Sequence, residues 1–271
     1  MCNFSVLLSV YNKEESTYLE KAIQSISSNQ SLIPTEIILI KDGTLNQELE
    51  LTIHNLEKKI QYLKVFGYEV NRGLGFALNY GLERCSYDLV FRMDTDDIAH
   101  PERFEIQLNC LKKNPEVSII GSNIEEFNIV PGDLEQFRIV PMTSEEIQNN
   151  KRKRNPFNHM TVLYKKSIVQ EFGGYKEMPG YEDYYLWIRL LEKSDGININ
   201  KSLVYARIGN NMIKRRQGIE FMIKEFRFQF TLFSENLISI RFFLRNVFIR
   251  GFSRLLPSSI LQIAYTKLLR K

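Results

Sequence analysis

Apolar and polar residues alternate along the first 120 residues in blocks that fit strands and helices in turn. Blocks of helical spacing at 14–28, at 46–59, from near Gly73 and at 101–115 separate the apolar runs. Such alternation predicts an α/β protein with a mainly parallel, Rossmann-like sheet and helices on both faces. The runs typical of buried strands are 4–10, 35–43, 62–66, 87–94 and 117–122.

The pattern changes after about residue 125. The segment "VPGDLEQ" predicts a loop, and "TSEEIQNNKRKRNPFNH" predicts a short helix that leads into a basic loop. Apolar spacing predicts a further helix over 182–192. No proline occurs between Pro179 and Pro257, so 216–251 can form one long helix.

Charge is distributed unevenly along the chain. Residues 201–271 contain 14 Lys and Arg against three Glu, while residues 1–200 contain 22 basic against 29 acidic residues. A basic tail that is rich in aromatic residues indicates an anionic partner surface, either a membrane or a nucleic acid. Arginines interrupt the apolar residues of this tail, so it does not predict a membrane span.

Cysteine usage and the N-terminal pattern bear on the compartment. Cys2, Cys85 and Cys110 show neither even pairing nor the spacing of a metal site. The first residues lack the basic segment and the long apolar run of a signal peptide. We therefore expect a cytoplasmic protein without structural disulfides.

Three carboxylates follow the strand predicted at 87–94 within four positions: Asp94, Asp96 and Asp97. Mg²⁺ and Mn²⁺ prefer hard oxygen ligands and are often bound by one or two carboxylates together with substrate phosphates. Ligands of open α/β sheets bind beyond the carboxyl ends of the strands, where this cluster is expected. The alternative is a solvated acidic turn in which Asp97 caps a helix.

Two further segments fit a nucleotide pocket. Asp42 ends the second predicted strand, either as a turn residue or as a carboxylate that accepts a hydrogen bond from a base. In "NRGLGFALNYGL", Gly73 and Gly75 open a helix beside Arg72. Free backbone N–H groups at a helix start favour phosphate, although a plain helix entry would use the same residues.

The segment "GYEDYYLW" starts a helix with Glu182 and Asp183. Acidic residues are favourable in any first helical turn, but a carboxylate among aromatic rings could also serve as a general base. The ring of Trp187 would suit a sugar. His159, a single histidine in a loop, is either structural or a contact for phosphate or acceptor.

Together, "SVYNKEE", "LIKDGT", "NRGLGFALNYGL", "FRMDTDDIAHPERFEIQ" and "GYEDYYLWIRL" resemble the bacterial family 2 glycosyltransferases, which are inverting enzymes of the GT-A fold. The chain is most similar to members that build exopolysaccharide, O-antigen or capsule, and "VYARIGNNMIKRRQG" is similar to the amylovoran-type subgroup. The resemblance covers about residues 3–218. It implies a catalytic domain at 1–218, with a nucleotide-binding half at about 1–120 and an acceptor half at about 121–218, and a helical extension at 219–271.

The resemblance also implies roles for single residues. Asp94 and Asp96 would hold Mn²⁺ or Mg²⁺, and Asp183 would be the catalytic base. The donor nucleotide sugar would contact Val10, Tyr11, Asn12, Glu15, Asp42, Arg72, Gly73, Asp94, Thr95 and Asp96. Candidate contacts for acceptor or phosphate are His159, Glu182, Trp187, Arg207, Arg215 and Arg216. Many relatives have a histidine after the acidic helix where this chain has "ARIGNN", so the resemblance implies no third protein ligand for the metal there. Arg207, Arg215 or Arg216 would meet the diphosphate instead.

We therefore expect a glycosyltransferase that uses a nucleotide-diphosphate sugar. UDP is the favoured nucleotide because a carboxylate at Asp42 suits the imide N–H of uracil. The acceptor would be a saccharide on polyprenyl diphosphate, and residues 219–271 would contact the inner face of the membrane. For those residues, core helices or a homodimer contact fit equally well.

Other functions remain open at this point. A sugar nucleotidyltransferase would be expected to have a glycine-rich basic segment after the first strand. The segment "SVYNKEES" at this position lacks that pattern. "KRKR" at 151–154 and the basic tail would suit nucleic acid, but the acidic body argues against a continuous phosphate track, and we expect no nucleic-acid partner. A protein that binds nucleotide sugar without transfer is a further alternative.

Overall fold

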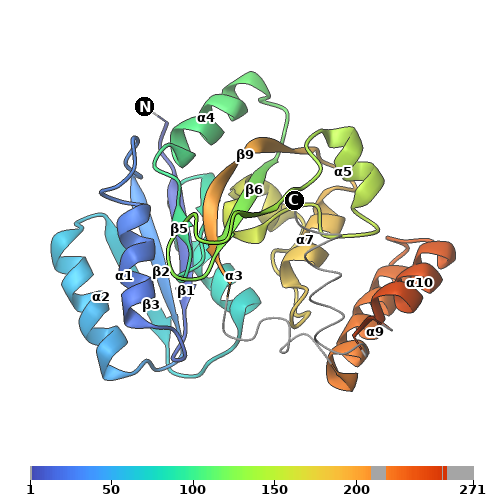
Figure 1. Cartoon of the computed structure of the whole chain (residues 1–271), viewed down its shortest axis with the longest axis horizontal. Helices are drawn as coiled ribbons and strands as arrows, with labels where there is room; N and C mark the ends of the chain where they lie inside the picture. Colours follow the sequence, from blue (N-terminus) through green and yellow to red (C-terminus); the bar gives the residue numbers. More distant parts are fainter. Residues whose placement is uncertain (1, 209–217, 252, 255–271) are drawn as a thin grey trace.

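A computed structural model describes residues 2–208, 218–251 and 253–254. Within these residues one nine-stranded sheet has the order β3-β2-β1-β4-β8-β6-β9-β5, and β7 pairs with β6 (Figure 1). The strands are β1 (Ser5–Val10), β2 (Glu36–Asp42), β3 (Leu63–Tyr68), β4 (Leu89–Arg92), β5 (Ile98–Ala99), β6 (Ile119–Phe127), β7 (Gln136–Arg138), β8 (Leu163–Lys165) and β9 (Gly196–Arg207).

The first four strands of this order are parallel to one another. Side chains alternate across a strand, and here both faces are buried: Val6 and Leu8 point into one core, and Leu7 points into the other. This explains why the strands appear in the sequence as continuous apolar runs. The predicted α/β class with a Rossmann-like sheet is confirmed.

Helices cover both faces of the sheet (Figure 1). One core contains side chains of α1, α2 and α4, and the other contains side chains of α3, α5, α6 and α7. A Cβ atom at Gly81 would collide with Leu7 and Ile40, so this glycine lets α3 lie close against the sheet. The helices are α1 (Ser16–Ser25), α2 (Gln47–Lys59), α3 (Leu74–Arg84), α4 (Arg103–Lys113), α5 (Ser144–Asn150), α6 (Lys166–Glu171) and α7 (Glu182–Leu190), with a 3-10 turn η1 (His159–Thr161).

The second half of the sheet is mixed. Strand β8 is antiparallel to both β4 and β6, whereas β9 runs parallel to β6. The 12-residue strand β9 was not predicted, because polar residues occur on its buried side. One of them, Asn198, donates hydrogen bonds from its amide nitrogen to the carbonyl oxygens of Pro141 and Pro156, while its Oδ1 is buried without a hydrogen-bond partner.

The prediction of one long helix over 216–251 is wrong. The structure has α9 (Ile219–Ser234), α10 (Ile240–Asn246) and a π-helical turn η2 (Val247–Gly251). The break falls at Asn236, whose φ of 59° is left-handed, and the N–H of Leu237 turns back to the carbonyl oxygen of Leu232. Asparagine tolerates this conformation better than most residues, and it often ends helices.

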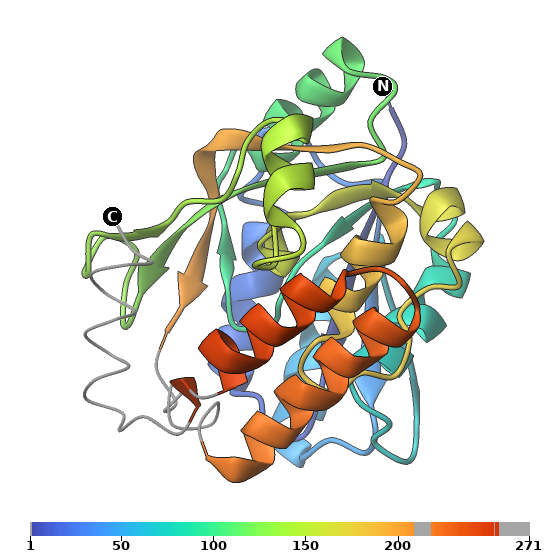
Figure 2. The ribbon, with the colours of Figure 1, turned by 90° about the vertical axis from the view of Figure 1, so that its right-hand side faces the viewer.

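Helices α9 and α10 lie side by side on the outside of the molecule (Figure 2). The inner side of α9 shares a small core with α7, in which Phe228 stacks on Tyr181 with ring centroids 4.5 Å apart. The extension expected from residue 219 onward therefore packs directly on the helix that carries Asp183. Among the described residues, no helix combines the length and apolar character needed to cross a bilayer.

Candidate active site

The candidate site lies where the parallel strands end. Strands β1, β2 and β4 run in the same direction, with Val10 in register with Lys41 and Leu7 in register with Arg92. Their carboxyl ends therefore share one edge of the sheet. Asp42 is the last residue of β2, and the segments that follow β1 and β4 contain the predicted residues of the first loop and the acidic cluster 94–97.

The acidic cluster is compact. Ligand atoms of Asp94, Asp96 and Asp97 lie within 4.8 Å of one another. Asp97 is buried, and one of its oxygens accepts a hydrogen bond from the N–H of Arg207 at 2.8 Å, while the other oxygen has no hydrogen-bond partner. Asp97 therefore anchors β9 and does not cap a helix, which corrects the alternative considered from the sequence.

The electrostatics of this cluster favour a cation. Burial, and then the charge of Asp94, raise the pKa of Asp96 to about 7. Burial, and then the charges of Asp96 and Asp94, raise the pKa of Asp97 well above its ordinary value. A divalent ion would offset the repulsion, and the unpartnered oxygen of Asp97 is a hard ligand, so the residues fit Mg²⁺ or Mn²⁺.

A buried arginine contacts the acidic cluster from the protein interior. Arg92 is 1% exposed, and its guanidinium contacts the carboxylate of Asp94. Its carbonyl oxygen accepts a hydrogen bond of 2.7 Å from Arg103, which is also fully buried. Our sequence reasoning missed Arg92, although a charged residue between Phe91 and Met93 in an apolar strand is a visible signal.

The loop after β1 reaches the cluster through an unpredicted residue. The hydroxyl of Thr95 donates a 2.8 Å hydrogen bond to Glu14, whose pKa is raised mainly by burial. Tyr11 and Glu15, which were predicted to contact the donor, are exposed in this loop. Val10 is completely buried in the core, so the expectation that it lines an open pocket is wrong.

Asn12 has a structural contact of its own. Its carbonyl oxygen accepts a 3.3 Å hydrogen bond from the side chain of Asn46, the residue that caps α2. The side chain of Asn12 itself is exposed at the same edge of the sheet.

Asp42 holds the segment that leads into α3. Its carboxylate accepts hydrogen bonds from the hydroxyl of Tyr68 at 2.9 Å and the side chain of Asn71 at 3.0 Å. It also accepts from the backbone N–H groups of Arg72 at 2.7 Å and Gly73 at 3.1 Å. Since a carboxylate offers about four acceptor positions, a contact with a base would replace or share one of these bonds.

The start of α7 faces the start of α3. Asp183 accepts a 2.7 Å hydrogen bond from the side chain of Asn155. Glu182 accepts one from the N–H of Gly180 at 3.0 Å, and burial raises its pKa. A Cβ atom at Gly75 would lie 3.3 Å from Glu182, so the acidic pair lies beside the predicted phosphate-binding turn.

Tyr175 is buried next to His159. Burial raises its pKa, and the charges of both Asp183 and Asp94 act in the same direction. Its hydroxyl is 3.1 Å from Nε2 of His159, and burial lowers the pKa of that histidine well below its ordinary value. His159 is therefore neutral in the folded protein and does not offer a positive charge to a phosphate.

The remaining predicted contacts have different outcomes. Trp187 is fully buried between the rings of Phe157 and Tyr175, so the prediction that it stacks on a sugar is wrong. Arg207 lies beside the cluster, donates to the carbonyl oxygen of Asp96 at 3.1 Å, and covers the ring of Tyr18. Predicted phosphate contacts that lie outside the described residues are Arg215 and Arg216.

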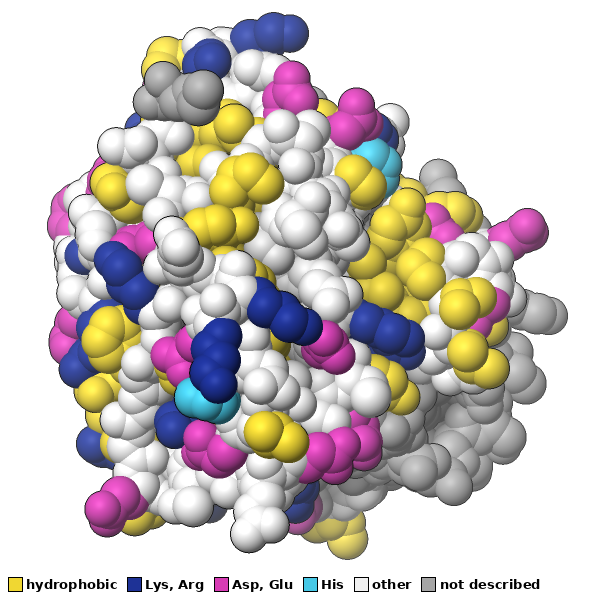
Figure 3. All heavy atoms as spheres, turned by 90° about the vertical axis from the view of Figure 1, so that its left-hand side faces the viewer, with side chains coloured by type: hydrophobic (Ala, Val, Ile, Leu, Met, Phe, Trp, Pro, Cys, Tyr) yellow, Lys and Arg dark blue, Asp and Glu magenta, His cyan; other side chains and the backbone are white. Residues whose placement is uncertain are grey.

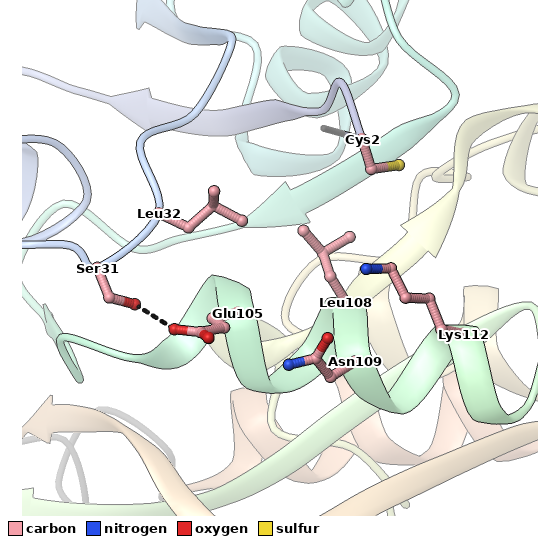
Figure 4. Close-up of a pocket in the computed structure, with 7 residues that line it drawn as sticks. All are labelled: Cys2, Ser31, Leu32, Glu105, Leu108, Asn109 and Lys112. Carbon is pink, nitrogen blue, oxygen red and sulfur yellow. Dashed lines mark hydrogen bonds between the residues drawn. The ribbon is translucent and has the colours of Figure 1, made fainter.

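A shallow hollow of about 270 Å³ lies elsewhere, beside α4 and the chain before β1 and β2 (Figure 4). It is on the amino side of the parallel strands, away from the acidic cluster. Its lining residues are Cys2, Ser31, Leu32, Glu105, Leu108, Asn109 and Lys112. On the surface shown in Figure 3, acidic and basic side chains are intermixed, which does not favour a continuous track for nucleic-acid phosphates.

Comparisons with known proteins identify chains that are similar to this one. The chain is 43% identical to an "Uncharacterized glycosyltransferase" of Haemophilus influenzae over 99% of both chains. It is 40% identical to the "UDP-Gal:alpha-D-GlcNAc-diphosphoundecaprenol beta-1,3-galactosyltransferase" of Escherichia coli, covering 99% of this chain and 97% of that protein. It is 36% identical to the "Amylovoran biosynthesis glycosyltransferase AmsE" of Erwinia amylovora, covering 97% and 98%.

Solved structures support the fold. S. aureus TarS 1–349 in complex with UDP-GlcNAc has a TM-score of 0.69 at 18% identity, covering 98% of this chain and 76% of that one. Mannosyltransferase PcManGT from Pyrobaculum calidifontis in complex with GDP-Man and Mn²⁺ has a TM-score of 0.62 at 15% identity, covering 98% and 81%. The expected GT-A fold is confirmed. The model of the family "Glycosyl transferase family 2" matches residues 5–173, and with the full-length relatives it shows that the chain belongs to this family.

Proposed function

We propose that this glycosyltransferase moves a hexose from a UDP-sugar to a saccharide on polyprenyl diphosphate, with inversion, during synthesis of a cell-surface polysaccharide. The relative of Escherichia coli that supports this is named for UDP-galactose and a diphosphoundecaprenol acceptor, and the match covers almost all of both chains. The observation that supports the proposal is the compact acidic cluster after β4, together with the position of Glu182, the neighbour of Asp183, beside the start of α3. Family membership favours transfer over the nucleotidyltransferase alternative.

In this proposal the acidic cluster holds the metal. Asp94 and Asp96 are the ligands, and the free oxygen of Asp97 is close enough to add to them. Bound Mn²⁺ or Mg²⁺ would supply Lewis-acid neutralisation of the charge that develops on the departing nucleoside diphosphate. Arg92 fixes the carboxylate of Asp94 from the buried side, so the ligand is oriented before the donor arrives.

The donor nucleotide would lie over the ends of β1 and β2. Tyr11, Asn12 and Glu15 would form one side of its pocket, and Asp42 would define the floor. By binding the backbone N–H groups of Arg72 and Gly73, Asp42 also fixes the turn into α3. That turn, together with the exposed guanidinium of Arg72, would favour the anionic part of the donor.

Asp183 would act on the acceptor. As general base it takes the proton from the acceptor hydroxyl, whose oxygen then attacks the anomeric carbon on the face opposite the leaving diphosphate. The amide of Asn155 orients the carboxylate. One displacement breaks the sugar–phosphate bond and forms the glycosidic bond, so the anomeric configuration inverts.

A direct assay tests this function. Purified protein would be incubated with UDP-galactose, UDP-glucose or UDP-N-acetylglucosamine, an N-acetylglucosaminyl diphospholipid acceptor and Mn²⁺. We expect one of these α-linked donors to give a product whose new linkage is β by NMR. A product with an α linkage, or transfer of a nucleotidyl group instead of a sugar, would contradict the proposal.

A further inference from the structure

Helices α9 and α10 have apolar side chains on two sides. The inner side belongs to the core shared with α7, where Phe228 and Leu232 are fully buried. A second set of apolar side chains is between 43% and 68% exposed. We call this set the outer face; it consists of Ile219, Ile223, Phe226, Phe230, Ile240, Leu244, Phe248 and Ile249.

The residues of the outer face recur at helical spacing along both helices. The α9 members follow one another at intervals of four, three and four residues, and those of α10 and η2 include Ile240, Leu244 and Phe248 at intervals of four. The two helices form the outermost layer on this side of the molecule (Figures 1 and 2). Large contiguous apolar surfaces are rare on soluble monomers, and they mark sites of contact with a partner or a membrane.

The exposed charges of the two helices are basic. Arg227, Arg241 and Arg245 are exposed among the apolar residues. The nearby acidic residues are already engaged: Glu225 is buried against two arginines, Glu235 accepts a hydrogen bond from Tyr185, and Glu220 pairs with Lys224. Glu225 lies 2.9 Å from Arg250 and 3.2 Å from Arg254. The distance from Glu235 to the hydroxyl of Tyr185 is 2.5 Å, and that from Glu220 to Lys224 is 2.7 Å. The outer face therefore carries net positive charge.

We infer that the outer face docks on an anionic lipid bilayer. Apolar side chains would enter the interface, and the three arginines would meet lipid phosphates, as in interfacial amphipathic helices. A second copy of the chain fits less well, because a two-fold contact would bring the same arginines face to face. The inference separates the two roles considered for residues 219–271, since the inner side packs on the core and the outer side faces the membrane.

Docking would place the active site at the membrane surface. Phe221, at the start of α9, lies beside Gly180 and Tyr181, directly before Glu182 and Asp183. A lipid-linked acceptor would thus reach the proposed base from the bilayer. This use of the surface rests on the proposed function, whereas lipid binding itself does not.

Flotation of the full-length protein with vesicles tests the inference without any sugar or nucleotide. We expect wild type to float with phosphatidylcholine vesicles that contain phosphatidylglycerol, and to lose this binding at high salt. The variant Ile223→Ser/Phe230→Ser/Leu244→Ser should bind to these vesicles at least about tenfold more weakly than wild type. The control variant Ile33→Ser/Leu51→Ser removes exposed apolar side chains from another surface and should bind like wild type.

A charge variant provides a second test that leaves every apolar residue in place. Arg227→Glu/Arg241→Glu/Arg245→Glu should reduce binding to the level seen with pure phosphatidylcholine, with an unchanged melting temperature. The inference is overturned if wild type does not float with the anionic vesicles, or if both variants float like the control. It is also overturned if the apolar variant instead abolishes a concentration-dependent dimer. None of these outcomes depends on transferase activity.

Discussion

Asp94 and Asp183 have different tasks in the proposed reaction, and their surroundings differ accordingly. Asp94 contacts the buried guanidinium of Arg92 and shares a small volume with two other carboxylates, which suits a metal ligand. Asp183 is held by the neutral amide of Asn155 in the first turn of a helix, which suits a residue that accepts and releases a proton.

The variant Asp183→Asn tests the second assignment. The amide keeps the shape of the side chain but cannot take up the proton, so we expect turnover to fall by ~10²–10⁴-fold. Affinity for the nucleotide should change little, because the proposed donor pocket lies at the ends of β1 and β2 and not at the start of α7. Steady-state kinetics and calorimetry on the same preparation measure both quantities. The nearby variant Glu177→Gln, at an exposed carboxylate, should keep full turnover. If Asp183→Asn turns over as fast as Glu177→Gln and wild type, Asp183 is not the general base.

His159 gives the folded protein a pH dependence. Its pKa in the folded state is well below the ordinary 6.5 because it is buried, so only the unfolded chain takes up a proton as the pH falls below that value. Its contribution to the free energy of unfolding is therefore complete above pH 6.5 and decreases by up to ~1.4 kcal/mol per pH unit below it.

Urea denaturation between pH 7 and pH 5 measures this effect. In the variant His159→Gln, the free energy of unfolding should fall less steeply as the pH decreases, by the slope that corresponds to the uptake of about one proton on unfolding. The variant His54→Gln removes an exposed histidine of α2 and serves as the matched control. Identical slopes for wild type and His159→Gln would show that His159 is not held neutral.

Residue patterns located the acidic cluster and Asp183, but they did not predict what those residues touch. Asp97 binds Arg207, which is 110 positions away, and no local pattern reports such a contact. Trp187 was misjudged for a related reason. An aromatic residue in a helix has the same local pattern whether it faces a ligand or a core, and only tertiary packing decides between them.

At the scale of elements, α7 is held between α3 and α9, and one buried carboxylate links it to the C-terminal helices. Glu225 of α9 is fully buried and pairs with Arg250 at 2.9 Å and Arg254 at 3.2 Å. It also accepts a 2.7 Å hydrogen bond from Tyr181, the residue before the acidic pair of α7. Movement of α9 would therefore be transmitted to the start of α7.

The variant Glu225→Ala tests this link. It leaves two arginines without their buried anion, and breaking a buried ion pair in this way costs about 3–5 kcal/mol. If α9 and α7 unfold together, thermal unfolding should remain a single transition at a lower temperature. Glu220→Ala, at the exposed end of the same helix, should leave the melting temperature nearly unchanged. A separate early transition in Glu225→Ala would show that the C-terminal helices fold independently.

The elements of the first half could be predicted because each apolar run matches a strand buried on both faces. The predicted runs 4–10 and 35–43 correspond to Ser5–Val10 and Glu36–Asp42. Strand β9 was not predicted because a polar residue, Asn198, lies on its buried side and donates hydrogen bonds to loop residues that are distant in sequence. The break between α9 and α10 was missed because no proline marks it, and a left-handed asparagine has no strong sequence pattern.

At the scale of the whole molecule, three regions meet around α7. The parallel strands end at the proposed donor side, and the loop between α5 and η1 carries Asn155. The C-terminal helices present exposed apolar side chains together with exposed arginines. In the proposed reaction the water-soluble donor would lie at the strand ends, and the lipid-linked acceptor would approach the proposed base from the side of the C-terminal helices. This proposal depends on a divalent metal at the acidic cluster, which would balance the negative charge that the donor brings.

Calorimetric titration of UDP into the full-length protein, with Mn²⁺ or with EDTA, tests that dependence most directly. We expect UDP to bind at least about tenfold more tightly with Mn²⁺ than with EDTA, since an ion held by the acidic cluster would neutralise charge on the diphosphate. The variant Asp94→Asn/Asp96→Asn should lose this difference, whereas Glu171→Gln/Glu177→Gln, which removes two exposed negative charges elsewhere, should keep it. Equal affinity of the wild-type protein for UDP with and without the metal would contradict the account.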